Sequence, residues 1–258
     1  MSVQFLDADK VSKTITKLVE RIEERFPDSG LLRVCRHLDE ISDHTKERSA
    51  AISRPIIWTK IVVWGLIVTT FVLCVILPFV LDSGFTEEDM TWKSLLEMGD
   101  PVFNEVVVIG AGFFFMFTLE NRIKRNRALK AIHELRSIAH VIDMHQLTKD
   151  PERVLMDRTY TTTEHSPKAE MDSFMLRRYL DYCTEMLSLT GKLAAVYIRD
   201  FDDEVALAAV NEVESLTTGL SSKIWQKIMI LYSAEKDQPQ VSLPENVRES
   251  TKPSELDK

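Results

Sequence analysis

The sequence predicts an all-α integral membrane protein with two transmembrane helices and a cytoplasmic helical bundle. Three observations lead to this fold class. Only eight of the 258 residues are Gly, which disfavours a turn-rich β architecture. The run from Ile61 to Leu81 is 21 residues long and holds no charged side chain, which is the length that crosses a bilayer core. Elsewhere the apolar residues recur at helical spacing, with charged residues between them.

Composition removes several classes of protein. Hydrophobic residues make up 45% of the chain and charged residues 28%, so the chain is too apolar to be disordered. The formal net charge of −8 argues against a nucleic-acid partner. The three cysteines, Cys35, Cys74 and Cys183, form neither a disulfide framework nor a zinc-binding spacing, and we expect them to pack in the core. No phosphate-binding loop is present, and we expect no cofactor and no metal.

The N-terminal region, residues 1–55, reads as two cytoplasmic helices. The first, over 9–26, has an apolar face and ends at the Pro27–Gly30 turn. The second runs from Leu31 to about Arg48 and bends into the first span at Arg54–Pro55, because Pro disfavours helix at the residue before it. The expected core positions of the two helices are Ile15, Leu18, Val19, Ile22, Phe26, Leu31, Val34, Leu38 and Ile41.

Residues 56–119 read as a two-helix transmembrane hairpin. Its second span, Val102–Leu119, is interrupted by Asn104 and Glu105 and is then uncharged. Gly110 and Gly112 would let another helix approach closely. The connecting loop, 82–100, holds six acidic residues and one Lys, whereas the outer flanks of both spans are basic. The positive-inside rule therefore places both termini in the cytoplasm and the loop outside, in a bacterial inner membrane or an equivalent.

The basic cluster directly after the second span has two interpretations. Clusters of this kind attract anionic lipid headgroups, and they also serve as the topology signal alone. The two follow from the same electrostatics, and the sequence does not separate them. The cluster consists of Arg122, Lys124, Arg125 and Arg127.

The region 120–233 reads as the main cytoplasmic part. The second span continues as one helix to Leu147, because no Gly or Pro interrupts it. A polar linker, 148–166, follows. Ser166–Pro167 then favours the start of a long helix to about Arg199. A second long helix runs to about Tyr232, and the two form the arms of a helical hairpin. Residues 234–258 read as a disordered tail. The expected core positions of the two arms are Phe174, Tyr182, Met186, Leu189, Leu193, Val196, Val205, Ala209, Val213, Leu216, Leu220, Ile224 and Ile228.

One polar stripe invites a metal-site interpretation. Side chains three and four positions apart share a helix face, so the stripe could meet a second His pair in the bundle. The chain has neither the Glu-x-x-His motif of two-metal carboxylate bundles nor an HExxH motif. Hydrogen bonds between helices are the better account. The stripe is His133, Arg136, His140 and Asp143, and the second pair is His37 and His44.

Three acidic residues mark the entry to the second span. Glu97, Asp100 and Glu105 lie where rings of carboxylates would select cations at a pore mouth. The pattern Glu97-Met98-Gly99-Asp100-Pro101, with the two-span plan, resembles the pore signature of the mitochondrial calcium uniporter family, which implies an acidic pore entrance. Leu96 stands where that family has Trp, and the two acid types are exchanged. The simpler interpretation makes Asp100 an N-cap and Pro101 the first helical residue.

These features support three functions. The first is a membrane-anchored, non-enzymatic protein of interaction or signalling, which self-associates and binds an unidentified cytoplasmic protein partner. Long amphipathic helices without a catalytic motif favour it. The second is an oligomeric cation channel or pore-forming effector, because two spans per chain cannot enclose a pore alone. The third is a metal-dependent enzyme that uses the His/Asp stripe.

Overall fold

The computed structural model is all-α. It describes residues 6–54, 57, 61–70, 72, 92–155, 165 and 171–237, and over 92–106 it describes the backbone. No strand occurs in these ranges, which confirms the predicted fold class at the level of secondary structure. The rest of the first predicted span, the loop to residue 91 and the tail from residue 238 lie outside the described residues.

The first two helices form an antiparallel hairpin, as predicted. Helix α1, Ala8–Arg25, is capped by Asp7, whose side chain accepts a hydrogen bond from the Asp9 amide at 3.0 Å. Helix α2, Gly30–Ser53, is capped by Ser29. It ends at Ser53, beyond the predicted end near Arg48, and Arg54 adopts an extended conformation before Pro55. All five expected core positions of α1 and its end are buried.

Helix α4, Trp92–Leu147, is a single helix of 56 residues. At 1.5 Å per residue it is about 84 Å long. The prediction that the second apolar segment continues into the bundle is therefore confirmed. The helix begins before Pro101, so the interpretation of Asp100 as an N-cap and Pro101 as the first helical residue is wrong.

The C-terminal hairpin consists of α7, Ser173–Ile198, and α8, Glu204–Asp237. Asp172 caps α7 by accepting a hydrogen bond from the Met175 amide at 2.7 Å, so Asp172 rather than Ser166 is the N-cap. A short helix, α5, Glu152–Leu155, lies within the predicted linker. Helix α8 continues beyond Tyr232 into the start of the predicted tail.

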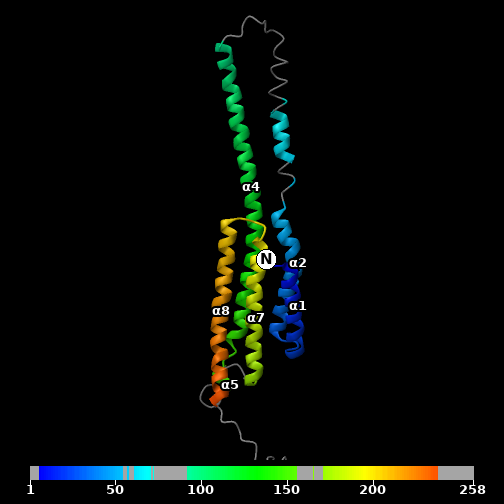
Figure 1. Cartoon of the computed structure of the whole chain (residues 1–258), viewed down its shortest axis with the longest axis vertical. Helices are drawn as coiled ribbons and strands as arrows, with labels where there is room; N and C mark the ends of the chain where they lie inside the picture. The colour runs from blue at the N-terminus through cyan, green and yellow to red at the C-terminus, as the bar shows by residue number, and fades with distance from the viewer. Residues whose placement is uncertain are drawn as a thin grey trace, which may run out of the picture.

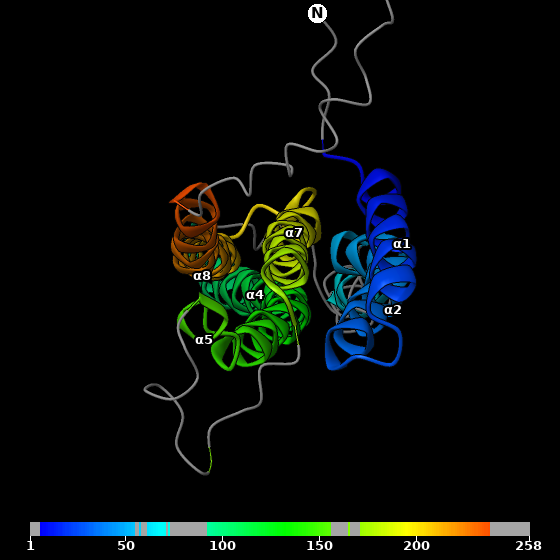
Figure 2. The ribbon, with the colours of Figure 1, turned by 90° about the horizontal axis from the view of Figure 1, so that it is seen from below.

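The helices pack into one elongated bundle (Figure 1). Seen from below, α7 lies between α1 and α8, with α4 and α2 covering its other side (Figure 2). Most of the predicted core positions are buried in one cluster, including Leu38, Met186 and Leu193 at 0% exposure. Two predictions are wrong, because Phe174 and Val205 are each 45% exposed. Both are the second residue of their helix, where a neighbour covers only one side.

The membrane prediction does not gain support from the helices themselves. Within the described ranges, no helix has the combination of length and hydropathy that a membrane span requires. The described part of the first predicted span is 61–70 and residue 72. The two apolar segments nevertheless differ from the bundle, because many of their large apolar side chains are exposed.

Candidate functional site: an apolar end above a charged junction

The bundle carries an unusual concentration of exposed apolar side chains at one end. They come from two segments, 61–72 and 107–117, which extend beyond the bundle (Figure 1). Their exposures run from 40% to 72%, with Phe114 the highest. Large contiguous apolar surface of this kind marks a site of association with protein or membrane. We call this set the apolar end: Ile61, Val62, Trp64, Leu66, Ile67, Val68, Val72, Val107, Phe113, Phe114, Phe115 and Phe117.

The two segments of the apolar end approach each other at one glycine. A Cβ added at Gly112 would lie 3.3 Å from Cδ2 of Leu66, so the glycine allows a close contact between the segments. Gly110, the other predicted packing glycine, has nothing within 4 Å of that position. Small residues at helix contacts permit close backbone approach, and Gly112 fits that role here.

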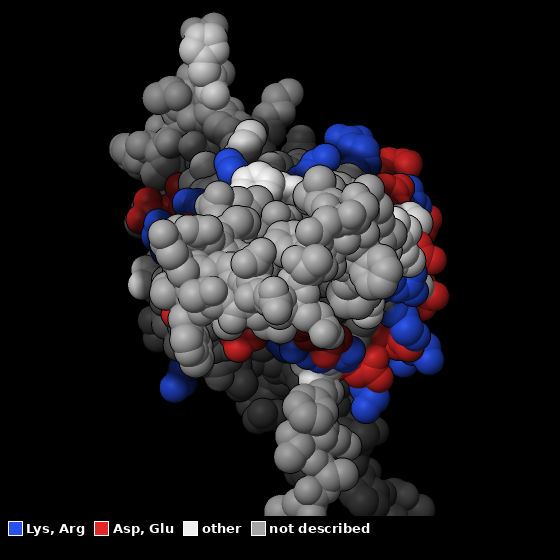
Figure 3. All heavy atoms as spheres, turned by 90° about the horizontal axis from the view of Figure 1, so that it is seen from above, with Lys and Arg blue, Asp and Glu red and all other residues white. Residues whose placement is uncertain are grey.

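A junction of charged residues lies where the apolar end meets the bundle. Three of the four predicted headgroup residues have protein partners. Lys124 pairs with Glu120 at 2.8 Å, Arg125 pairs with Asp203 at 2.7 Å, and Arg127 donates to the Ala51 carbonyl at 3.3 Å. Arg122 is exposed. Viewed from above, acidic and basic side chains alternate around the rim of the bundle (Figure 3). Two members of the basic cluster therefore make contacts between helices: Arg125 joins α4 to the start of α8, and Arg127 joins α4 to α2.

Asp203 is the central acid of this junction. Its side chain is 7% exposed and accepts hydrogen bonds from Nε of Arg125 at 2.8 Å and from the Ala206 amide at 3.0 Å. Burial raises the pKa of this carboxyl, but the hydrogen bonds from Arg125 and Ala206 outweigh it and bring the pKa below its ordinary value. The ionised Asp203 thus caps α8 and attaches the α7–α8 turn to α4.

Below the junction, hydroxyl groups connect α2 to α7 inside the core. The Thr45 hydroxyl donates to the Tyr197 oxygen at 3.3 Å, and the Ser49 hydroxyl donates to the Val196 carbonyl at 3.1 Å. All four residues are buried. Buried polar groups need partners, so these hydrogen bonds fix the register of the two helices. Helix α2, which precedes the first apolar segment in the chain, is therefore held to α7 by specific contacts.

The predicted His stripe lies on the outside of the bundle. His133, His140, His37 and His44 are exposed. Arg136 pairs with Glu212 of α8 at 2.9 Å, and Asp143 accepts from Gln146 at 2.6 Å. Across the described residues, no group of three or more His, Cys, Asp or Glu side chains has the geometry to hold a metal ion. The stripe therefore contributes one helix-to-helix ion pair.

The cysteines that the structure describes pack in the core, as predicted. Cys35 and Cys183 are both 0% exposed. Burial raises the pKa of each thiol to about 12, so neither forms a thiolate near neutral pH. Cys74 lies outside the described residues.

The predicted pore-mouth residues lie on the first part of α4. Because the helix begins at Trp92, positions 97, 100 and 104 follow one another at three- and four-residue spacing on a continuous helix. Glu97 and Asp100 thus share a helix face with Asn104. Glu105 is offset from that face by one residue.

Comparison of the chain with protein-family models, curated proteins and solved structures finds no match to any of them. Inference about function therefore depends on the residues alone. Sequence reasoning missed Asp203 and Tyr197 as partners of the junction and of α2. The contact between Arg125 and Asp203 joins residues 78 positions apart, so helical periodicity does not indicate it.

Proposed function

We propose that the protein is a membrane-anchored, non-enzymatic helical bundle that acts in interaction or signalling and self-associates. The observation that carries this proposal is the apolar end. Its side chains are exposed on two neighbouring segments, 61–72 and 107–117. Burial of such surface is favourable at roughly 25 cal/mol per Å². A bilayer supplies that burial, and the uncharged run 61–81 has the length to cross one.

The continuity of α4 supports a signalling role. One helix runs from the exposed Phe113–Phe117 stretch into the buried stretch from Ala128 to Ile142. A change in tilt or rotation at one end of a rigid helix is felt at the other, and helix shifts at interfaces are a common means of switching. In this proposal the bundle lies in the cytoplasm with both termini, and the segment 82–100, which includes the start of α4 from Trp92, faces outward.

Membrane association tests the anchoring directly. The full chain, expressed in bacteria and recovered from the membrane fraction, is expected to float with lipid vesicles and to resist alkaline carbonate extraction. The double variant Ile67→Lys, Phe114→Lys places two charges on the apolar end and is expected to leave the membrane fraction, because each charge costs about 2.5–3.5 kcal/mol at a bilayer centre.

The matched control makes the same change on α4 within the bundle. Met144 is 66% exposed, so Met144→Lys is expected to float as the wild type does. Release of the wild-type chain by carbonate, or equal flotation of the double variant, would contradict the proposal.

An oligomeric cation channel is the second candidate. The observation in its favour is the shared helix face of positions 97, 100 and 104, which a ring of chains would present together. The mass of the complex in mild detergent, corrected for bound detergent, is the first test. A closed assembly of four or more chains favours a channel, whereas a monomer or dimer contradicts it. Vesicle flux that persists in the Glu97→Gln, Asp100→Asn, Glu105→Gln variant would also contradict it.

A further inference from the structure

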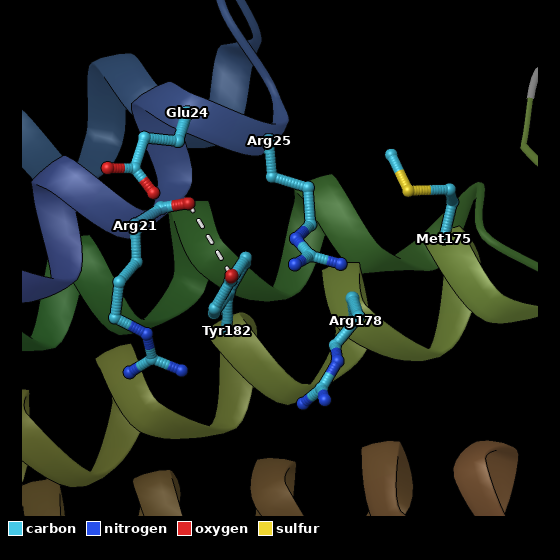
Figure 4. A pocket seen from close by; sticks show the side chains of 6 residues that line it. All are labelled: Arg21, Glu24, Arg25, Met175, Arg178 and Tyr182. Atoms are coloured by element: carbon cyan, nitrogen blue, oxygen red, sulfur yellow. Dashed lines mark hydrogen bonds between the residues drawn. The ribbon is translucent and has the colours of Figure 1, made fainter.

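A hollow of about 580 Å³ opens between α1 and α7 at the end of the bundle opposite the apolar end (Figure 4). In Figure 4, Arg25 of α1 and Arg178 of α7 lie next to each other, whereas the Glu24 carboxylate lies on the side of Arg21. Three of the six lining side chains are therefore guanidinium groups and one is a carboxylate. The six are Arg21, Glu24, Arg25, Met175, Arg178 and Tyr182.

Arginines gather around one exposed aromatic ring beside this hollow. The guanidinium carbons of Arg25, Arg177 and Arg178 lie 5.6, 5.7 and 5.7 Å from the ring centroid of Phe174. No two of them are more than about 11 Å apart, which is close to one Debye length, so their mutual repulsion is only partly screened. Cation–π attraction to Phe174 offsets part of that repulsion. The Asp181 carboxylate, 3.5 Å from Arg178, offsets another part, and a bound anion would relieve more of the repulsion.

The three arginines of the hollow differ in how closely an acidic side chain pairs with each guanidinium group. Arg21 makes a bidentate pair with Glu185, at 2.7 and 3.1 Å. Arg178 reaches Asp181 only at 3.5 Å, and its Nε is buried without a hydrogen-bond acceptor. Arg25 has no ion pair or hydrogen bond to any residue that the structure describes. The Arg25 guanidinium is thus available to a ligand, and Arg178, which has a long ion pair and an Nε without an acceptor, can turn toward a ligand that satisfies the Nε.

The wall that carries these arginines is rigid. The Phe26 ring packs edge to face against Tyr179 and Tyr182, with centroids 5.5 and 6.2 Å apart. The Tyr182 hydroxyl donates to the Arg21 carbonyl at 3.4 Å, which ties α7 to α1 beneath the hollow. Sites whose supporting side chains are already held in place lose less entropy on binding.

From this geometry we propose that the hollow between α1 and α7 binds a phosphate monoester, with Arg25 and Arg178 on the phosphate and Met175, Tyr182 and Phe174 beside the organic group. Guanidinium forks match phosphate oxygens in bidentate geometry, and a dianion matches two guanidinium groups at once. The volume fits a small organic molecule, since ligand pockets span about 300–1,000 Å³. The inference is independent of membrane anchoring, because every residue in it belongs to the bundle.

The test is calorimetric titration of the full chain in mild detergent with phenyl phosphate. Binding with a dissociation constant below about 1 mM is expected. Arg25→Gln and Arg178→Gln are each expected to weaken it at least tenfold, because each removes one of the two guanidinium groups proposed to contact the phosphate. Arg136→Gln is the matched control, since it removes an exposed arginine paired with Glu212 on the other side of the bundle, and its binding is expected to equal that of the wild type.

Two further titrations define the ligand class. Inorganic phosphate that binds as tightly as phenyl phosphate would overturn the role of the organic group. Benzoate that binds as tightly would overturn the preference for phosphate over carboxylate. The absence of phenyl phosphate binding at 10 mM, or equal binding by both arginine variants and the wild type, would overturn the site. Thermal unfolding of each variant, monitored by circular dichroism, verifies that loss of binding does not reflect loss of the fold.

Discussion

Helix α4 has two apolar stretches that differ in what covers them. Between Ala128 and Ile142 the apolar side chains that face α2, α7 and α8 are buried, with exposures from 0% to 7%, whereas Val141 is 36% exposed. From Phe113 to Phe117 the phenylalanines of the same helix are at least 55% exposed. The buried stretch alternates with charged residues, whereas the exposed stretch has none over 106–119. The comparison indicates that the two stretches suit different surroundings, and that helix packing accounts for only one of them.

The largest expected difference is in the loss of stability when one side chain of each stretch is truncated to Ala. Leu135→Ala opens a cavity at a position with 0% exposure and should lower the free energy of unfolding by about 2–5 kcal/mol. Phe114→Ala removes more atoms but from a 72% exposed position, so its effect on bundle stability should stay within about 0.5 kcal/mol. Denaturant unfolding in detergent, followed by circular dichroism, measures both. Equal losses would erase the distinction between the stretches.

A smaller effect is expected at the junction between them. Asp203→Ala removes the cap of α8 and the partner of Arg125, which should cost about 1–2 kcal/mol. The exposed neighbour Asp202→Ala is the control and should change stability by less than about 0.5 kcal/mol. Because the pKa of Asp203 is lowered in the bundle, its contribution is present at neutral pH and is lost below about pH 4, as the carboxyl protonates. A wild-type acid transition that is unchanged in Asp203→Ala would contradict this role.

The lower end of α4 adds a second pH dependence of stability, which comes from a histidine rather than a carboxyl group. His145 is half-buried against Gly30, and burial, followed by the charges of Arg33 and Lys149, lowers its pKa below 6.5. The unfolded chain therefore binds more protons here, and the free energy of unfolding should rise with pH up to about 6.5. His145→Gln should flatten that slope. Unfolding profiles from pH 5 to pH 7.5 measure it, and identical slopes in the two proteins would count against the assignment.

The smallest effect is expected on the outer face of the buried stretch. Arg136 and Glu212 form an ion pair whose side chains are 47% and 64% exposed. Solvent-exposed pairs contribute little, so Glu212→Gln should cost less than about 0.5 kcal/mol. A loss above 1 kcal/mol in the same unfolding assay would mean that the polar stripe of α4 stabilises the bundle more than its exposure implies.

Much of the fold could be predicted from periodicity, and the failures have local causes. The core faces of α1 and α2 follow from apolar spacing alone, and the continuity of α4 past Leu119 follows from the absence of Gly and Pro there. Pro101 was misread because a proline at the first helical position and one inside a helix look alike in sequence. Phe174 and Val205 continue the apolar spacing into the first turn of their helices, where each side chain is covered only in part and stays 45% exposed.

The candidate sites were less predictable than the fold. The apolar end was visible as uncharged sequence, because hydropathy needs no tertiary contact to be read. The partners of the junction were not, since Arg125 and Asp203 meet only when the hairpin of α7 and α8 packs on α4. The arginines around Phe174 converge from α1 and α7, which are some 150 residues apart in the chain, so their clustering becomes visible only in the folded bundle.

The proposal requires that exposed positions in the two stretches of α4 meet different solvents, lipid near Phe114 and water near His133. Spin labels test it in a Cys74→Ser background, with single cysteines introduced at Phe114 or at His133, in lipid vesicles. Both positions are exposed, whereas the native Cys35 and Cys183 are buried and protonated. We expect the label at 114 to collide with oxygen but not with a water-soluble nickel chelate, and the label at 133 to show the reverse. Equal access of the chelate to both labels would contradict it.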